Sequence, residues 1–139
     1  MIDDDQSFME PLVDALSYEG FRVLTARTGS EGLALLAREP VDLVTVDIML
    51  DPGESLREHV KSQTTGVYLC REIKSLYPRL DIFCISVVSD PQTIAPIRQL
   101  GIRILTKGET SLRTVLSLLR SKLTGIAYST EQPPQDQDQ

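Results

Sequence analysis

The sequence predicts an α/β protein with a mostly parallel sheet and helices on both faces. Short apolar runs alternate with segments of helical periodicity along most of the chain, which is the pattern of βα units joined by right-handed crossovers. Two of these runs, 41–47 and 81–88, are apolar nearly throughout, as strands covered on both faces are.

Strand character is found in four short runs rich in Val, Ile, Leu and Thr. They are 21–26, 41–47, 81–88 and 102–107. The alternation requires one more strand at the front, where only Met1 and Ile2 precede a run of acids. We therefore expect a first strand clipped to two residues. Either the natural chain begins upstream of Met1, or another group fills the gap.

Helical spacing of apolar residues, at intervals of three and four, marks five segments. They are 7–19, 30–38, 66–78, 92–100 and 110–123. Thr28 and Glu31 form a capping box ahead of the second segment. Pro78 ends the third segment, and Pro96 lies inside or opens the weaker fourth one.

Composition bounds the class of protein. A chain of 139 residues, 41% hydrophobic and 24% charged, suits one soluble domain, which we place at 1–124. The segment 125–139 lacks apolar periodicity and is expected to be disordered. A net charge of −6 argues against nucleic acid or an anionic membrane as partner. Cys70 and Cys84 lie among apolar neighbours, which predicts reduced core cysteines and a cytoplasmic location.

Polar residues end the predicted strands. They are Asp3, Asp4, Asp47, Ser86 and Lys107. Parallel strands present such residues together at the carboxyl edge of the sheet. Three carboxylates there would repel unless a divalent cation such as Mg²⁺ neutralised them. A lysine and a hydroxyl suit phosphoryl transfer, and Asp47 becomes a candidate nucleophile. Singly, each residue also has an ordinary structural explanation.

Five stretches, taken in order, resemble one family. They are "IDDDQ", "GFRVLTARTGSEGLALL", "VDLVTVDIML", "IFCIS" and "ILTKG". Over residues 1 to about 124 the chain resembles the receiver domain of bacterial two-component response regulators. The resemblance implies a (βα)5 doubly wound parallel five-stranded sheet in the flavodoxin-like order 2-1-3-4-5, here with the first strand clipped.

The resemblance also implies roles for the acids. Asp3 and Asp4 match the family's acidic pair, which binds Mg²⁺ together with the phosphoacceptor, here Asp47. The backbone carbonyl of Met49 would ligate the same ion. Asp5 is then a surplus acid, expected in solvent or near a helix start.

By the same resemblance, Ser86 is the switch hydroxyl and Lys107 pairs with the phosphoryl group. The expected donor is a sensor histidine kinase or a phosphotransfer protein. The domain would assist its own phosphorylation and dephosphorylation without being a turnover enzyme. Its expected outputs are a downstream protein or a fused output domain, with a possible homodimer through the segment 110–123, and contact with neither nucleic acid nor membrane.

Several positions depart from the family pattern. Val87 replaces a small residue, Ile104 stands where an aromatic switch residue is common, and Gly108 follows the lysine in place of proline. These departures keep open a degenerate receiver that acts as a phosphate-independent protein-binding module. An aspartyl-phosphate phosphatase is disfavoured, because such enzymes carry a second carboxylate where Met49 stands.

The loop after the acceptor is about ten residues longer than the family's. This insertion, 51–65, holds Arg57, Lys61 and the only histidine, His59. It is either a solvated insertion or a lid or partner-recognition loop beside Asp47.

Overall fold

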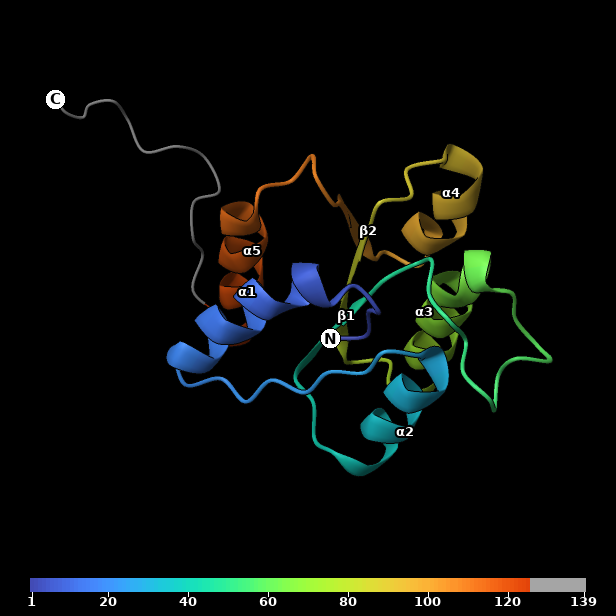
Figure 1. Cartoon of the computed structure of the whole chain (residues 1–139), viewed down its shortest axis with the longest axis horizontal. Helices are drawn as coiled ribbons and strands as arrows, with labels where there is room; N and C mark the ends of the chain where they lie inside the picture. The colour runs from blue at the N-terminus through green and yellow to red at the C-terminus, as the bar shows by residue number, and fades with distance from the viewer. Residues whose placement is uncertain (126–139) are drawn as a thin grey trace, which may run out of the picture.

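Three regular parallel strands form the centre of the molecule. The structure, a computed structural model, describes residues 1–125, apart from the side chain of Ser62. The strands are β1 (Leu43–Val46), β2 (Asp81–Ser86) and β3 (Arg103–Thr106), in the spatial order β1-β2-β3. They coincide with three of the four predicted runs and end at or next to the polar residues. The strands lie between the helices in the middle of the molecule (Figure 1).

Two further strand positions are reduced to single bridges. Ile2 bridges Val46 on one side and Ala26 on the other, both in parallel. The segments therefore lie in the order 2-1-3-4-5, and the flavodoxin-like fold with a clipped first strand is confirmed. The prediction of a regular strand over 21–26 is wrong, because only the backbone groups of Met1 and the N–H of Asp3 face this segment, whereas those of Ile2 bond to Thr45 and Asp47.

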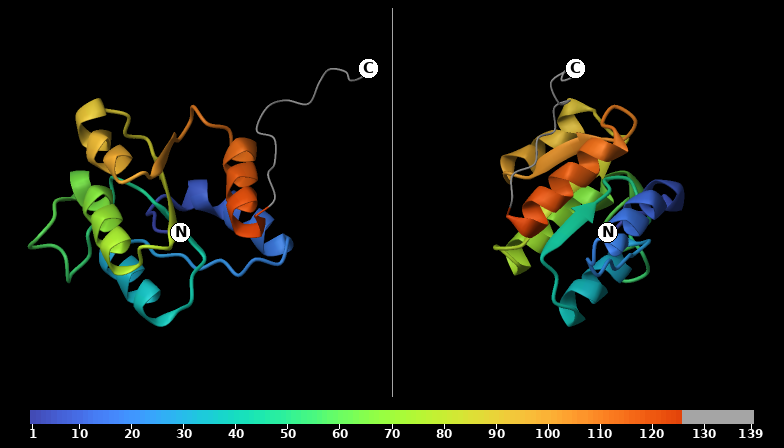
Figure 2. Two further views of the ribbon diagram at one scale, coloured as in Figure 1. Left: turned by 180° about the vertical axis from the view of Figure 1, so that it is seen from behind. Right: turned by 90° about the vertical axis from the view of Figure 1, so that its left-hand side faces the viewer.

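Helices cover both faces of this sheet (Figure 2). They are α1 (Gln6–Tyr18), α2 (Gly29–Arg38), α3 (Thr65–Leu76), α4 (Pro91–Gln99) and α5 (Leu112–Thr124), with a 3₁₀ turn at Ser62–Thr64. Each α-helix begins and ends within two residues of its predicted bounds. Four of them start behind a side-chain cap, from Asp5, Thr28, Asp90 and Ser111 respectively. Within residues 1–125, no helix is long and apolar enough to cross a bilayer.

The core has two layers because side chains alternate along each strand. Phe83 and Ile85 of β2 pack with α1 and α5 on one face. Ile82 and Cys84 face the other way, toward α2, α3 and α4. Cys70 of α3 lies in that second layer, and both cysteines are free and buried, as predicted.

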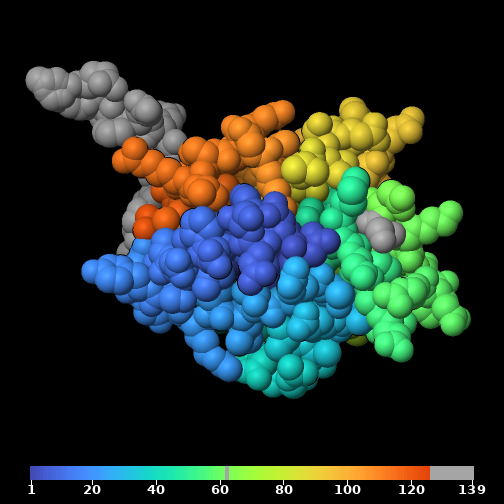
Figure 3. Space-filling model, in the orientation of Figure 1, coloured from blue at the N-terminus to red at the C-terminus, as the bar shows by residue number. Residues whose placement is uncertain are grey.

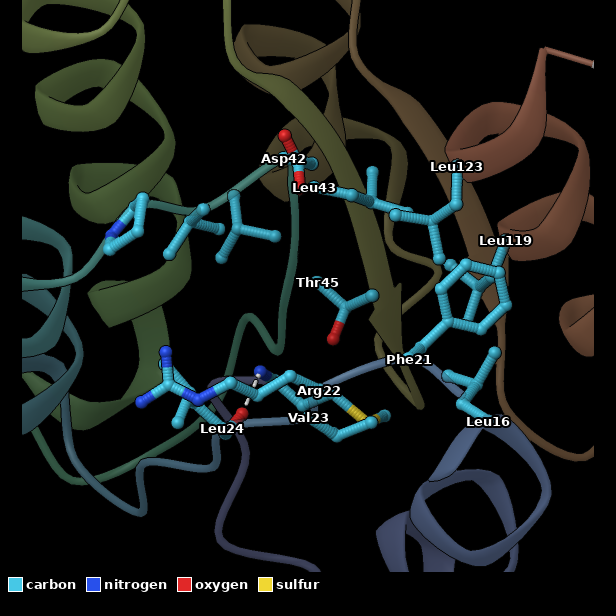
Figure 4. Close-up of a pocket in the computed structure, with 14 residues that line it drawn as sticks. Leu16, Phe21, Arg22, Val23, Leu24, Asp42, Leu43, Thr45, Leu119 and Leu123 are labelled. Carbon is cyan, nitrogen blue, oxygen red and sulfur yellow. Dashed lines mark hydrogen bonds between the residues drawn. The ribbon is translucent and has the colours of Figure 1, made fainter. Parts of the chain in front are cut away.

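A cavity lies at the N-terminal end of the first strand, beside Met1 (Figure 4). It has a volume of about 350 Å³ and opens between β1, α5 and the segment 21–24. Apolar side chains make up much of its wall, including Leu16, Phe21, Leu43, Leu119 and Leu123. The carbonyl oxygen of Thr45 accepts from the N–H of Ile2 at 2.8 Å, and in a parallel strand the N–H of Thr45 points to the same side. The wall therefore has the apolar surface and the backbone donor that an extended segment ahead of Met1 would use.

An extended apolar segment fused ahead of Met1 should stabilise the protein by filling this cavity. With Val-Leu-Ile added, we expect the free energy of unfolding to rise by about 1.5–3 kcal/mol for each aliphatic side chain that enters. Gly-Ser-Gly of equal length is the control and should change little. Urea denaturation followed by circular dichroism measures both. Equal midpoints for the two extensions would show that the cavity does not accept a strand.

Candidate functional site

Three carboxylates meet at the carboxyl edge of the sheet. Asp3 follows the bridge residue Ile2, and Asp47 follows β1. Both are buried, whereas Asp4 is exposed. One carboxylate oxygen from each of the three lies within 4.8 Å of the other two. The structure thus brings together the acids that the sequence assigned to one site.

Lys107 is the cation at the centre of this cluster. Its Nζ lies 2.8 Å from Oδ2 of Asp3, 3.4 Å from Oδ2 of Asp47 and 3.6 Å from Oδ2 of Asp5. The ring of Phe8 lies 4.6 Å from the same atom and adds a cation–π contact. With the side chain only 7% exposed, the ammonium is held between carboxylates and an aromatic face.

Two opposing effects set the pKa values of the site, namely burial of each charged group and its interactions with neighbouring charges. Burial raises the pKa of Asp3 to about 6, and the charge of Asp47 acts in the same direction, against the hydrogen bond from Lys107. Burial alone would lower the pKa of Lys107. The hydrogen bond to Asp3 and the charges of Asp47 and Asp5 outweigh it and raise that pKa. Lys107 therefore stays charged while Asp3 titrates close to neutral pH.

One oxygen of the Asp47 carboxylate has no hydrogen-bond partner among the described residues. Oδ1 of Asp47 is buried and unpaired among residues 1–125, while Oδ2 faces Lys107. A buried anionic oxygen without a donor is unfavourable. A divalent cation would remove that penalty, and three nearby carboxylate oxygens are hard ligands of the kind that Mg²⁺ takes. The residues present fit such an ion.

The other predicted residues lie along the same edge or beside it. Ser86 ends β2 and is buried, and its hydroxyl accepts from the N–H of Val88 at 3.2 Å. Since Val46 pairs with Cys84, Ser86 lies one step further along than Asp47. Asp5 caps α1, accepting from the N–H of Phe8 at 3.1 Å, as expected for an acid near a helix start. Met49 is 47% exposed, and its role as a backbone ligand stays a prediction.

Sequence reasoning missed two residues that position the site. Gly66 lies in the first turn of α3, and a Cβ there would be 2.3 Å from the carbonyl oxygen of Asp47. Its N–H also donates to the carbonyl of Ile48 at 2.8 Å. A glycine at a helix start was the available signal. Phe8, which covers Lys107, fits an ordinary apolar stripe and gave no such signal.

Comparisons with known proteins agree on one family. The family model described as response regulator receiver domain matches residues 1–117. The transcriptional regulatory protein GlrR of Escherichia coli (strain K12) is 32% identical over 108 residues, which cover 77% of this chain and 22% of GlrR. The chain thus spans less than a quarter of the length of that relative.

Two solved structures share the fold. One is a CheY-like response regulator receiver domain protein from Methanospirillum hungatei JF-1, with a TM-score of 0.74, 23% identity and coverage of 90% of this chain and 91% of that one. The other is a response regulator protein from Burkholderia pseudomallei with a phosphorylated aspartic acid, calcium ion and citrate. Its TM-score is 0.67 at 22% identity, covering 90% of this chain and 67% of that one.

Replacing Gly66 by alanine should displace the acceptor. The added Cβ would meet backbone atoms of Asp47 and Ile48, which cannot move aside, so we expect a loss of about 1–3 kcal/mol in the free energy of unfolding. Ser75→Ala is the control, since Ser75 is an exposed residue of the same helix and alanine favours a helix. Chemical denaturation compares the two, and equal losses would contradict a special role for Gly66.

Asp3→Asn should stabilise the protein at neutral pH when a chelator is present. The folded state raises the pKa of Asp3 from 3.8 to about 6, so above pH 6 it holds a charge that is better accommodated after unfolding. We expect a gain of about 1–3 kcal/mol at pH 7. The gain should shrink as the pH falls through 6 toward 4, where the wild-type carboxyl is neutral too.

Asp14→Asn is the control for this test, because it removes the same charge from an exposed position on α1. Urea titrations across pH 4–8 measure both variants. A gain for Asp3→Asn that does not change with pH would show that burial of the carboxylate is not its cause.

Proposed function

The chain belongs to the response regulator receiver domain family, and we propose on this premise that it takes a phosphoryl group onto Asp47. The donor is the phosphohistidine of a sensor histidine kinase or of a phosphotransfer protein. The observation that carries this proposal is the geometry of the acceptor. Asp47 offers one unpaired buried oxygen beside a lysine and two further carboxylates.

The transfer exchanges one bond to phosphorus for another. A carboxylate oxygen of Asp47 attacks the phosphorus, a P–O bond forms, and the P–N bond to the donor imidazole breaks. The imidazole keeps the electron pair of that bond and takes a proton from solvent. Lys107, already 3.4 Å from Asp47 and held charged, donates to the phosphoryl oxygens. The hydroxyl of Ser86 is the second donor from the same edge.

Four groups would hold Mg²⁺ at this edge. They are the carboxylates of Asp3, Asp4 and Asp47 and the backbone carbonyl of Met49. The ion supplies positive charge against the crowded carboxylates and the phosphoryl oxygens. The phosphorylated aspartic acid and calcium ion of the Burkholderia pseudomallei protein support this assignment by analogy.

Signalling would pass through protein contacts in the cytoplasm. The relative GlrR is a longer transcriptional regulatory protein. This supports a fused output domain or a downstream protein as the target. The surface of α4, β3 and α5 is the proposed contact face for a partner or a homodimer, and Leu112 at its start is 42% exposed. In this role the domain modifies itself and turns over no other substrate.

Incubation with acetyl phosphate should add one phosphoryl group to Asp47. Intact mass spectrometry should show a gain of one phosphoryl mass that requires Mg²⁺, because the neutralised carboxylates then admit the anionic donor. Asp47→Asn is the control and should show no gain, since an amide oxygen is a poor nucleophile. The same samples are checked for folding by circular dichroism.

A folded wild-type protein that gains no mass would instead favour the phosphate-independent module. Val87, which is 63% exposed beside the site, and Ile104 in place of an aromatic residue are the features that this alternative rests on. A gain that persists in Asp47→Asn would place the phosphoryl group on another residue.

A further inference from the structure

The backbone at the start of α2 and the hydroxyl of Ser30 together hold the loop that follows Asp47. The Ser30 hydroxyl donates to the carbonyl of Pro52 at 3.0 Å and accepts from the N–H and hydroxyl of Ser55 at 3.1 and 2.8 Å. These three bonds use its full capacity. Gly53 has a φ of +85°, and a Cβ there would be 2.5 Å from the Ser30 hydroxyl. With Leu56 buried as well, this part of the insertion is docked on the protein.

The docked loop forms one wall of a hollow beside the acceptor site. In Figure 3 the loop (green) lies at the surface next to the N-terminal residues (dark blue). The hollow has a volume of about 820 Å³ and is lined by Asp4 and Met49 on the side of the site, and by Arg57 and Lys61 on the side of the loop. Asp4 belongs to the carboxylate cluster as well, so the hollow adjoins that cluster through Asp4.

Arg57 and Lys61 line the same hollow from two parts of the loop. The N–H of Val60 donates to the carbonyl of Leu56 at 3.0 Å, which closes a helical turn that holds Arg57. Lys61 follows this turn in an extended conformation, with φ −95° and ψ 151°. Leu56 faces the core, and the two cations face the hollow. Arg57 is held 3.3 Å from Asp51, and Lys61 has no ion-pair partner in the part of the chain that the structure describes.

Charge at the site explains what these cations can do. The three carboxylates of the cluster together with Asp5 and Asp51, set against Lys107 and one divalent cation, leave an excess of two negative charges. Arg57 and Lys61 are the cations among the residues that line the hollow, whereas Glu54 and Glu58 of the same loop are exposed and do not line it. A phosphoryl donor is itself an anion, so without the two cations it would approach a negative field. Charges within a Debye length of about 8–10 Å act on such an approach.

We propose that Arg57 and Lys61 form a cationic rim that binds the phosphoryl donor as an anion and brings it to Asp47. The chemical class of ligand is a small acyl phosphate dianion, and the rim acts before the bond to phosphorus is made. The proposal rests on the function proposed above and adds to it a binding site supplied by the insertion.

The test measures the second-order rate constant of phosphorylation by acetyl phosphate at several salt concentrations. Arg57→Gln and Lys61→Gln should each lower it by about two- to fivefold at low salt, and the double variant by more. The dependence on salt should become flatter in each. Phosphoramidate carries one negative charge fewer than acetyl phosphate, so its rate constant should fall less in these variants. Arg71→Gln, an exposed arginine of α3, is the matched control and should behave as wild type.

If Arg57 and Lys61 served only to hold the loop in place, their replacement would change neither the salt dependence of the rate constant nor the ratio of the rate constants for the two donors. Unchanged rate constants and salt slopes in a double variant that is still phosphorylated would overturn the rim and leave the function of Asp47 intact. A folded wild-type protein that is not phosphorylated at all would overturn both. Loss of rate equal for both donors and at every salt concentration would also overturn the rim.

Discussion

The acidic edge of the sheet is organised by one ion cluster, in which the Lys107 ammonium lies between the buried carboxylates of Asp3 and Asp47. Burying these charges is unfavourable unless each finds a partner. Lys107 partners Asp3 and Oδ2 of Asp47 and leaves Oδ1 of Asp47 unpaired. The unpaired Oδ1 is therefore the weak point of the cluster, and a cation bound beside it would remove the cost of burying it.

Strand ends were predictable because the signal is local. An apolar run followed by a polar residue is read directly from the chain, and the parallel arrangement then brings Asp3, Asp47 and Lys107 to one edge. Strand pairing is not local in this sense. The segment 21–26 has the composition of a strand, yet only Leu24 and Ala26 bond through their backbone to the first strand, at Met1 and Asp3. The composition of a segment does not show how many backbone groups its neighbour offers for pairing.

Loop packing was the least predictable feature, again for a physical reason. The insertion carries many polar residues and suggests a solvated segment. Its position is decided by a few contacts with a distant helix, through Ser30, and by Gly53, whose positive φ lets the chain pass close to that hydroxyl. Contacts between residues more than twenty positions apart leave no periodic pattern. Similarly, Gly66 matters for the atoms that it approaches, and these are known only once α3 is placed on β1.

The acidic pair is held by very little backbone. The N–H of Ile2 donates to Thr45, its carbonyl accepts from Asp47 at 3.0 Å, and the N–H of Asp3 donates to Ala26 at 2.9 Å. These few bonds fix Asp3 relative to Asp47. The cavity lies at the N-terminal end of the first strand, so it adds no packing contacts there. A longer first strand would have distributed the same restraint over several residues. The precision of the acceptor site is consequently coupled to the packing around Ile2, whose side chain rests against Gly32 of α2. A change in that apolar contact would shift the carboxylates through the backbone bridge between Ile2 and Val46, although no charged group is altered.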